Sequence, residues 1–232
     1  MNAYRHLFFD LDHTLWDFDR SSRETTDELF EYYHFSRFPG LTPLAFYEAF
    51  RTANYHFWGL YNQSKVTKEE IRDRRFKLVF EKLGLSLEDC PPDIGKEYLY
   101  NCPKKPYLLP QCLETMEALA EHFALHILTN GFTDVQALKL QSAGIEHFFK
   151  TVTTSDCTGF KKPHATIFKH ALKQAGAQKE ESLMVGDNWE TDVLGAKNFG
   201  MDCIYYNPEK KKRALLEIRE IHSLWQLKSL IP

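Results

Sequence analysis

Five short apolar runs, each ending in polar residues, alternate with amphipathic segments along most of the chain. The runs have the length and the β-branched and aromatic content of buried strands: HLFFD (6–10), LHILTN (125–130), TVTTSD (151–156), SLMVGD (182–187) and CIYYN (203–207). The segments between them have helical spacing, and three of the four end on a glycine suited to the residue after a helix: 112–123, 133–144, 165–176 and 191–200. This alternation predicts an α/β fold built on a doubly wound parallel sheet.

The interval from Phe18 to Lys104 interrupts the alternation, because it contains no convincing strand. Its apolar residues instead recur at helical spacing: Phe46, Phe50, Phe57 and Tyr61, then Ile71, Phe76, Val79 and Leu83. We therefore expect a helical domain at 18–104, inserted after the first strand of a core that comprises 1–17 and 105–232. The proline-spaced segment NCPKKPYLLP (101–110) cannot be continuous helix and is a candidate hinge.

Composition narrows the kind of protein. The chain of 232 residues is 43% hydrophobic and 26% charged, which is typical of soluble globular proteins, and its net charge of −3 gives no basis for binding nucleic acid. Five scattered cysteines without a CxxC pair predict reduced thiols, with neither a disulfide framework nor a zinc site. With no signal-peptide pattern and no apolar run near 20 residues, we expect a cytoplasmic protein without membrane partners, either a monomer or a small homo-oligomer.

Polar side chains follow the ends of the predicted strands. Ligands of open α/β sheets bind outside the carboxyl ends of the strands, so residues at these ends are candidates for a common site. The set comprises Asp10 and Asp12, Thr129 and Asn130, and Asp187, together with Lys162 of GFKKP and Asp192 of GDNWETD, which come just after strand ends. We expect carboxylates, a hydroxyl and a lysine to share one crevice.

These residue types suit phosphoryl transfer. Mg²⁺ prefers oxygen ligands and commonly uses a couple of carboxylates with a substrate phosphate, for which Asp10 and Asp187 are natural candidates. Lys162 and Thr129 could stabilise the charge on the transferring group. With the cation present, Asp10 could attack phosphorus and form an aspartyl-phosphate.

Asp12 then has a separate task. Two residues after the nucleophile, it could protonate the leaving oxygen and later accept a proton from the attacking water. We therefore expect Asp10 to stay ionised beside the metal and Asp12 to exchange a proton during turnover.

The motifs DLDHT, LTNG, GFKKP and GDNWETD, in this order, resemble the four motifs of the haloacid dehalogenase superfamily. The resemblance covers the whole sheet domain, and it implies a helical cap inserted after the first motif. It implies Asp10 as nucleophile and Asp12 as acid/base, with the Asp12 backbone carbonyl as a further Mg²⁺ ligand. It also implies phosphate binding by Thr129, Asn130 and Lys162. Asp187 is implied as a metal ligand, with Asp192 supporting it.

Three longer segments, FFDLDHTLWDFD, LTNGFTDVQALKL and SLMVGDNWETDVLGA, resemble the branch of cytosolic pyrimidine nucleoside 5′-monophosphatases. The resemblance implies a Mg²⁺-dependent phosphomonoesterase that acts on nucleotides, with a preference for pyrimidine ones. The aromatic residues of the insertion are expected mainly in its core, although one or two of Tyr47, Tyr55, Trp58 and Tyr61 could stack on a nucleobase. Trp16 and Phe18 are expected to pack rather than to bind a base.

Other activities are compatible with the same scaffold. A phosphatase or mutase for a small sugar or organic phosphate such as phosphoglycolate would share the core and differ in the cap. A haloacid dehalogenase would use an aspartate nucleophile but requires neither Mg²⁺ nor an acid at the second position, so Asp12 and Asp187 argue against it. A phospho-accepting signalling module also groups acids, a threonine and a lysine around Mg²⁺, but it has no large cap.

Overall fold

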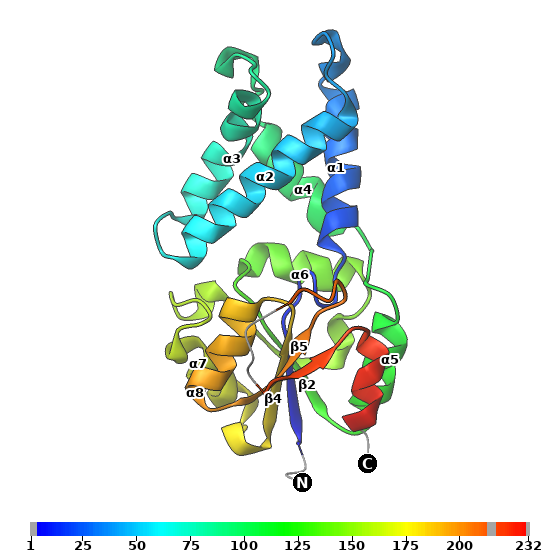
Figure 1. The fold of residues 1–232 in the computed structure, drawn as a ribbon, viewed down its shortest axis with the longest axis vertical. Helices are drawn as coiled ribbons and strands as arrows, with labels where there is room; N and C mark the ends of the chain where they lie inside the picture. Colours follow the sequence, from blue (N-terminus) through cyan, green and yellow to red (C-terminus); the bar gives the residue numbers. More distant parts are fainter. Residues whose placement is uncertain (1–3, 213–216, 231–232) are drawn as a thin grey trace. The chain divides into compact units, whose positions relative to one another are not determined.

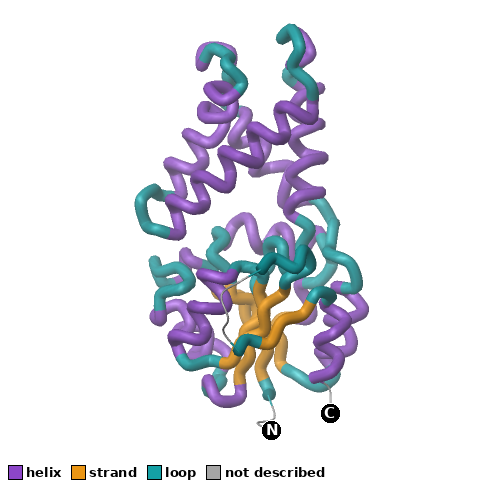
Figure 2. The backbone as a smooth tube through the Cα atoms, in the orientation of Figure 1, coloured by secondary structure: helices purple, strands orange, loops and turns teal. Residues whose placement is uncertain are grey.

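The computed structural model describes residues 4–212 and 217–230. The chain divides into two compact units, one formed by residues 1–18 and 106–232 and the other by residues 19–105. Figures 1 and 2 show that the first unit contains a sheet with helices around it, whereas the second is built from helices and loops. Among the described residues, no helix combines the length and the apolar character needed to cross a membrane.

Within the described residues, the sheet has six strands and every pairing is parallel. In chain order the strands are β1 (His6–Phe9), β2 (Ala124–Leu128), β3 (Phe149–Thr153), β4 (Ser182–Gly186), β5 (Asp202–Tyr206) and β6 (Arg219–Ile221), and in space their order is β3-β2-β1-β4-β5-β6. The predicted doubly wound parallel sheet is therefore confirmed. The edge strand β6 was not predicted, because it has three residues and two of them are charged.

Helices cover both faces of this sheet. The helices of this unit are α5 (Cys112–Ala120), α6 (Thr133–Ser142), α7 (Ala165–Ala175) and α8 (Leu194–Phe199), the last preceded by a π-helical turn at Trp189–Val193. Figure 1 shows α7 and α8 on one side of the sheet and α5 on the other. Phe8 of β1 and Met184 of β4, both fully buried, pack in one cluster with Phe168 of α7 and Ala196 of α8. Apolar side chains of the strands and of the helices thus pack together in one part of the core.

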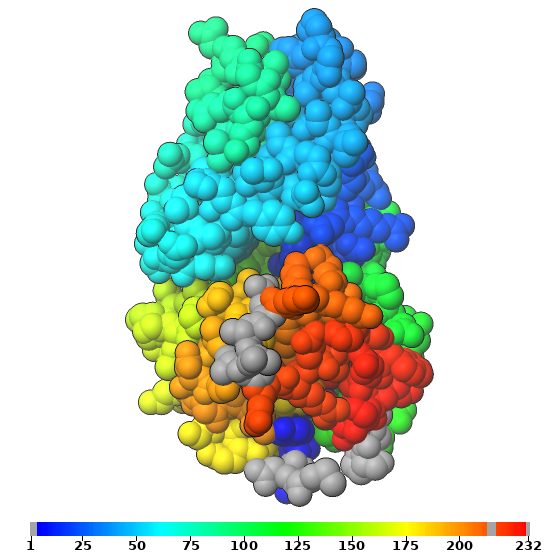
Figure 3. All heavy atoms as spheres, in the orientation of Figure 1, coloured from blue at the N-terminus to red at the C-terminus, as the bar shows by residue number. Residues whose placement is uncertain are grey.

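Short 3₁₀ helices make up much of the remainder: Phe35–Arg37, Leu87–Asp89, Cys102–Lys104, Glu146–Phe148, Ser155–Cys157, Lys179–Glu181 and Leu224–Leu230. The last of these packs on α5 and buries Leu224 and Leu227. In Figure 3 this C-terminal segment, in red, forms part of the surface of the sheet unit.

The second unit contains α1 (Phe18–Tyr32), whose first residue belongs to the sheet unit, with α2 (Pro43–Asn62), α3 (Lys68–Lys82) and α4 (Ile94–Asn101). Local signals set the helix starts: the Thr42 hydroxyl caps α2 ahead of Pro43, and Thr67 with Glu70 forms a capping box on α3. The apolar residues at helical spacing form the unit's interior as expected, apart from the half-buried Leu83. They are Phe46, Phe50, Phe57, Tyr61, Ile71, Phe76 and Val79.

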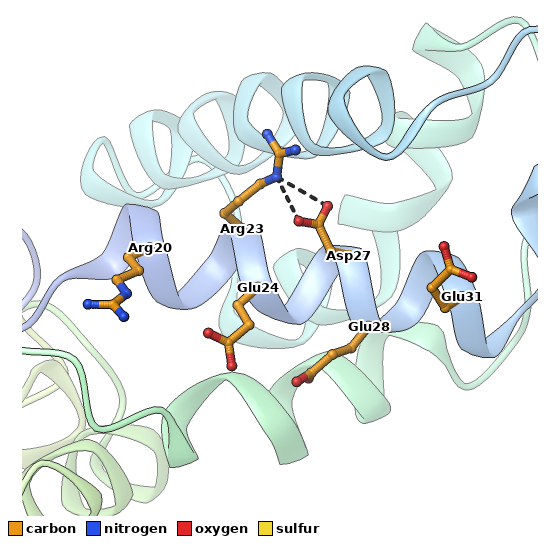
Figure 4. A pocket seen from close by; sticks show the side chains of 6 residues that line it. All are labelled: Arg20, Arg23, Glu24, Asp27, Glu28 and Glu31. Carbon is orange, nitrogen blue, oxygen red and sulfur yellow. Dashed lines mark hydrogen bonds and ion pairs between the residues drawn. The ribbon is translucent and has the colours of Figure 1, made fainter.

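One side of α1 carries charged residues instead. Figure 4 shows Arg23 directed toward Asp27 one turn on, with Nε 2.9 Å from Oδ2. Lys105 extends to the same side and pairs with Glu24 and Glu28. These pairs are partly exposed, so each contributes little to stability.

Candidate active site

The first strand delivers two carboxylates to the carboxyl edge of the sheet. β1 lies between β2 and β4, and the backbone N–H of Asp10 continues the ladder by donating to the carbonyl of Val185 (3.0 Å). Asp12 follows two residues later, before a turn in which His13 has a positive φ of 61°. Because β2 ends next to β1 on one side and β4 on the other, Thr129 and Asp187 reach the same edge.

Lys162 lies at the centre of this edge and is 1% exposed. Its ammonium group has three hydrogens, and they are donated to Asp10 Oδ1 (2.8 Å), Asp192 Oδ1 (2.7 Å) and the carbonyl of Leu128 (2.6 Å). The pKa of Lys162 is raised, because the attraction of Asp10 and Asp192 outweighs the cost of burying the charge. The structure therefore places the predicted lysine against the predicted nucleophile, as a buried cation.

Asp192 is held by its own neighbours. Besides Lys162, its carboxylate accepts hydrogen bonds from the Thr191 hydroxyl (3.2 Å) and the Asn188 backbone N–H (3.0 Å). Gly186 leaves room for it, since a Cβ there would overlap the Asp192 carboxylate. With both oxygens engaged by protein donors, Asp192 is suited to supporting the site rather than to binding a ligand directly.

Asp187 is the less constrained acid of the pair. Its carboxylate accepts one hydrogen bond from the Thr14 hydroxyl (3.0 Å), whose oxygen in turn accepts from the Asp187 backbone N–H (3.1 Å). Carboxylate oxygens of Asp10, Asp187 and Asp192 all lie within 4.8 Å of one another. Asp10 and Asp192 bind Lys162 directly, and Asp187 adds a third carboxylate beside them.

Burial and the crowding of these acids raise the pKa values of Asp10 and Asp187. Burial, followed by repulsion from Asp192, raises the pKa of Asp10 to about 7 against the attraction of Lys162. Burial and the charges of Asp10 and Asp192 raise the pKa of Asp187 well above its usual range. A divalent cation would offset this repulsion, and oxygen donors from carboxylates are what Mg²⁺ prefers. The residues present therefore fit a magnesium ion held by Asp10 and Asp187.

Asp12 has a different environment. Lys139 of α6 lies 2.5 Å from its Oδ1, and the Gln136 amide nitrogen donates to its Oδ2 (3.0 Å). Burial opposes ionisation of Asp12, but the attraction and hydrogen bond of Lys139 outweigh it, so the pKa of this carboxyl is lowered. Asp12 therefore differs from Asp10 in its lysine partner and in the direction of its pKa shift.

Thr129 is 2% exposed and already accepts two hydrogen bonds, from the Gly131 backbone N–H (3.0 Å) and from Gln136 (2.9 Å). A hydroxyl accepts at most two, so its own O–H is left to donate. The side chain of Asn130 contacts the backbone of Lys162: its amide group donates to the Lys162 carbonyl (2.9 Å) and accepts from the Lys162 N–H (2.7 Å). The Asn130 side chain therefore positions the lysine.

All the predicted site residues lie at this edge of the sheet, and the structure adds others that sequence reasoning missed. Thr14 lies in the first motif, and the sequence predicts no role for it, but its hydroxyl donates to Asp187. For Gln136 and Lys139 the sequence predicts only a place in a helix. Their signal was two polar residues three apart on a helix, both of which prove to be buried. Trp16 is fully buried, as expected, with Lys139 Nζ 4.5 Å from its ring centroid.

The comparisons with known proteins agree with this geometry. Residues 4–200 match the family model of haloacid dehalogenase-like hydrolases. The chain is 29% identical over 208 residues to pyrimidine 5′-nucleotidase PynA of Streptococcus pneumoniae, covering 88% of this chain and 84% of that one. It is 27% identical over 228 residues to pyrimidine 5′-nucleotidase YjjG of Escherichia coli, covering 97% and 96%.

A solved structure is also similar along the whole length. The crystal structure of the HAD-hydrolase YfnB of Bacillus subtilis, bound to magnesium, aligns with a TM-score of 0.84 at 26% identity and covers 98% of each chain. Since the family model spans most of the chain and the fold agrees, this protein belongs to the haloacid dehalogenase-like hydrolases.

Proposed function

We propose that the protein is a Mg²⁺-dependent phosphomonoesterase that forms an aspartyl-phosphate on Asp10 and prefers nucleoside 5′-monophosphates, especially pyrimidine ones. The observation that carries the proposal is the pair of aspartates in different environments, one among acids that favour a cation and the other paired with a lysine. The similarity to two pyrimidine 5′-nucleotidases along most of the chain supports the choice of substrate.

In the first step, a carboxylate oxygen of Asp10 attacks phosphorus as the ester P–O bond breaks. Asp12 passes a proton to the leaving oxygen, which departs as an alcohol. The Thr129 hydroxyl donates to a phosphate oxygen, and Lys162 supplies positive charge next to the nucleophile. When bound, Mg²⁺ offsets the negative charge shared by phosphate and carboxylates, held by Asp10, Asp187 and the Asp12 backbone carbonyl.

In the second step, water attacks the phosphorus of the aspartyl-phosphate. Asp12 accepts a proton from that water, the bond between phosphorus and Asp10 oxygen breaks, and inorganic phosphate leaves. The two steps return Asp10 and Asp12 to their starting states. Asp192 and Asn130 take no part in bond changes and keep Lys162 in place.

The helical unit is proposed as the cap that selects the leaving group. It is inserted shortly after β1 and the two aspartates that follow this strand, and caps of this kind exclude water from the reaction. Tyr47 and Tyr61 are buried within the unit, which suits a structural role, whereas Tyr55 is exposed and Trp58 half-buried. Tyr55 and Trp58 are therefore the better candidates for stacking on a base.

Phosphate release from a panel of esters tests the proposal. Purified protein is incubated with Mg²⁺ and with pyrimidine and purine nucleoside 5′-monophosphates, sugar phosphates, phosphoglycolate and an aryl phosphate. We expect the highest kcat/KM with pyrimidine nucleotides, and no turnover of any ester by Asp10→Asn. Weak, equal hydrolysis of all esters would remove the nucleotide assignment and leave the phosphatase one. Turnover of the aryl phosphate by Asp10→Asn would show that the nucleophile is another residue.

A dehalogenase is the second candidate, because several solved dehalogenases share the fold. One of them, from Xanthobacter autotrophicus, aligns with a TM-score of 0.78 at 18% identity, a likeness that concerns the fold alone. Halide release from a 2-haloacid without Mg²⁺ would favour it. The acid cluster around Asp187 and the separate Asp12 argue for the phosphatase.

A further inference from the structure

The Asp12 carboxylate is held by two residues of α6 whose role is unassigned. Gln136 and Lys139 are three positions apart on the helix, so both side chains leave the same face. Both are buried, at 0% and 5% exposure, and both have their donor groups on Asp12, one on each oxygen. A carboxylate has about four acceptor directions, so two remain for other partners.

Gln136 also joins Asp12 to the phosphate side of the site. Its amide nitrogen donates one hydrogen to Asp12 Oδ2 (3.0 Å) and the other to Thr129 Oγ1 (2.9 Å). A carboxylate can only accept, so this contact requires the nitrogen, and not the oxygen, of the amide to face Asp12. One carboxamide therefore sets both the place of Asp12 and the direction in which Thr129 can donate.

Gly131 makes this arrangement possible. A Cβ at residue 131 would overlap the carboxamide of Gln136, so a residue with any side chain would push the amide away. Thr129 Oγ1 also accepts from the backbone N–H of Gly131. Gly131 thus leaves the space that Gln136 needs to reach Asp12 and Thr129.

The placement of Gln136 lowers stability, because one of its polar atoms is buried without a partner among the described residues. The Gln136 Oε1 atom is buried and accepts no hydrogen bond from the residues that the structure describes. An unpaired buried acceptor costs about 1–3 kcal/mol, and such groups in folded proteins often have a functional reason. Lys139, in turn, is withdrawn from water against the Trp16 ring to reach Asp12.

We infer that Gln136 and Lys139 are positioning residues for the acid/base Asp12, which hold its carboxylate where it meets the leaving oxygen and link it to the Thr129 hydroxyl. This inference rests on the proposed function. Neither residue touches the phosphorus. They act through Asp12 and Thr129, so their effect is largest when the leaving group most needs a proton.

Dependence on the leaving group tests the inference. We expect Lys139→Met to lower kcat/KM for a nucleoside 5′-monophosphate by about 100-fold, the scale of general acid catalysis. The loss for 4-nitrophenyl phosphate should be below about tenfold, because its leaving oxygen departs without a proton. Lys139→Arg should recover part of the loss, and Gln136→Met should resemble Lys139→Met with a further loss from Thr129. Exposed residues give matched controls in Lys173→Met and Gln141→Met, which should match the wild type.

A double variant isolates the path of the effect. If Lys139 acts only through Asp12, Asp12→Asn with Lys139→Met should be no slower than Asp12→Asn alone. Multiplied losses in the double variant, or equal losses for both leaving groups, would overturn the inference and leave the proposed phosphatase function intact.

Crystal structures decide the matter without any turnover. In Lys139→Met and Gln136→Met the Asp12 carboxylate should move by about 1 Å or more from its wild-type place, a displacement large enough to cost a hundredfold in rate. If the wild type releases no phosphate from any ester, the proposed function fails by itself. An Asp12 carboxylate that stays in place in both variants would overturn the positioning role, whether or not the wild type is active.

Discussion

Lys162 and Asp192 form an ion pair in which Nζ lies 2.7 Å from Oδ1 and both side chains are 1% exposed. Asp10 shares the same ammonium group at 2.8 Å. The lysine is thus fixed from one side by an acid with no solvent access and from the other by the proposed nucleophile. Removing the Asp192 charge would cost the ammonium group one charge-assisted hydrogen bond and leave it paired with Asp10.

Asp192→Asn is therefore expected to lower the free energy of unfolding by about 2 kcal/mol, the scale of one hydrogen bond to a charged group, because Lys162 would keep Asp10 as a carboxylate partner. Urea unfolding at neutral pH measures the change. The exposed Glu146 supplies a control, since Glu146→Gln should stay within about 0.5 kcal/mol of the wild type. A loss below 1 kcal/mol, on the order of an ordinary hydrogen bond, would mean that the Lys162–Asp192 charge pair is not a main support of the site.

Mg²⁺ should stabilise the protein more at pH 8 than at pH 5.5. Without a cation, the pKa of Asp10 is about 7 in the folded protein against 3.8 in the unfolded chain. The folded state therefore binds more protons between these values, and stability falls as pH rises through this window. Mg²⁺ binds the ionised form and removes that penalty, so the rise in Tm over an EDTA-treated sample should grow with pH. Asp187→Asn should abolish the rise, and an equal rise at both pH values would contradict the assignment of these ligands.

The sequence predicted the parts of the fold that depend on local pattern. Alternation of apolar runs and amphipathic segments predicts β1 to β5 and the helices between them, and the strand ends locate Asp10 and Asp187. β6 lacks an apolar run, so its place at the sheet edge depends on pairing with β5. Tertiary pairing of this kind leaves no periodic signal in a single sequence.

The contacts within the site were less predictable. Lys139 is separated from Asp12 by 127 positions, so its effect on the pKa of Asp12 could not be foreseen. Burial and the neighbouring protein charges together raise the pKa of Asp10 and lower that of Asp12, whereas an ionised nucleophile and a proton-donating acid need the opposite order. The expectation that Asp10 is ionised assumed a metal beside it. The pKa of Asp12 depends on Lys139, which belongs to a distant part of the sequence.

Gly131→Ala is expected to reduce activity by about 100-fold, because the new Cβ would displace the Gln136 amide from Asp12 and Thr129. Overpacking should also cost about 1–3 kcal/mol of stability. Gly59, in the interior of α2, has open space where its Cβ would lie, so Gly59→Ala should be active and up to about 1 kcal/mol more stable. Combining Gly131→Ala with Gln136→Ala should restore stability without restoring rate. Full activity of Gly131→Ala would show that the close approach has no catalytic purpose.

His126 of β2 should make the sheet unit sensitive to acid. The ring is 1% exposed, stacks on Phe8 with centroids 4.7 Å apart and contacts His6 (Nε2 to Nδ1, 3.1 Å) and the Thr151 hydroxyl (2.8 Å). Burial, then the charges of His6 and Lys150, lower its pKa from 6.5 to about 4.

Between these two pKa values the unfolded chain binds more protons than the folded protein, so stability rises with pH in this window and is lost as pH falls below 6.5. From the two pKa values, His126 should account for about 2 kcal/mol lost between pH 8 and pH 5. Urea unfolding at both pH values measures it. His126→Phe keeps the stacking on Phe8 and should reduce the difference by that amount, whereas His122→Phe, at an exposed histidine, should leave it unchanged. An undiminished difference in His126→Phe would place the acid sensitivity in other groups, such as the carboxylates around Lys162.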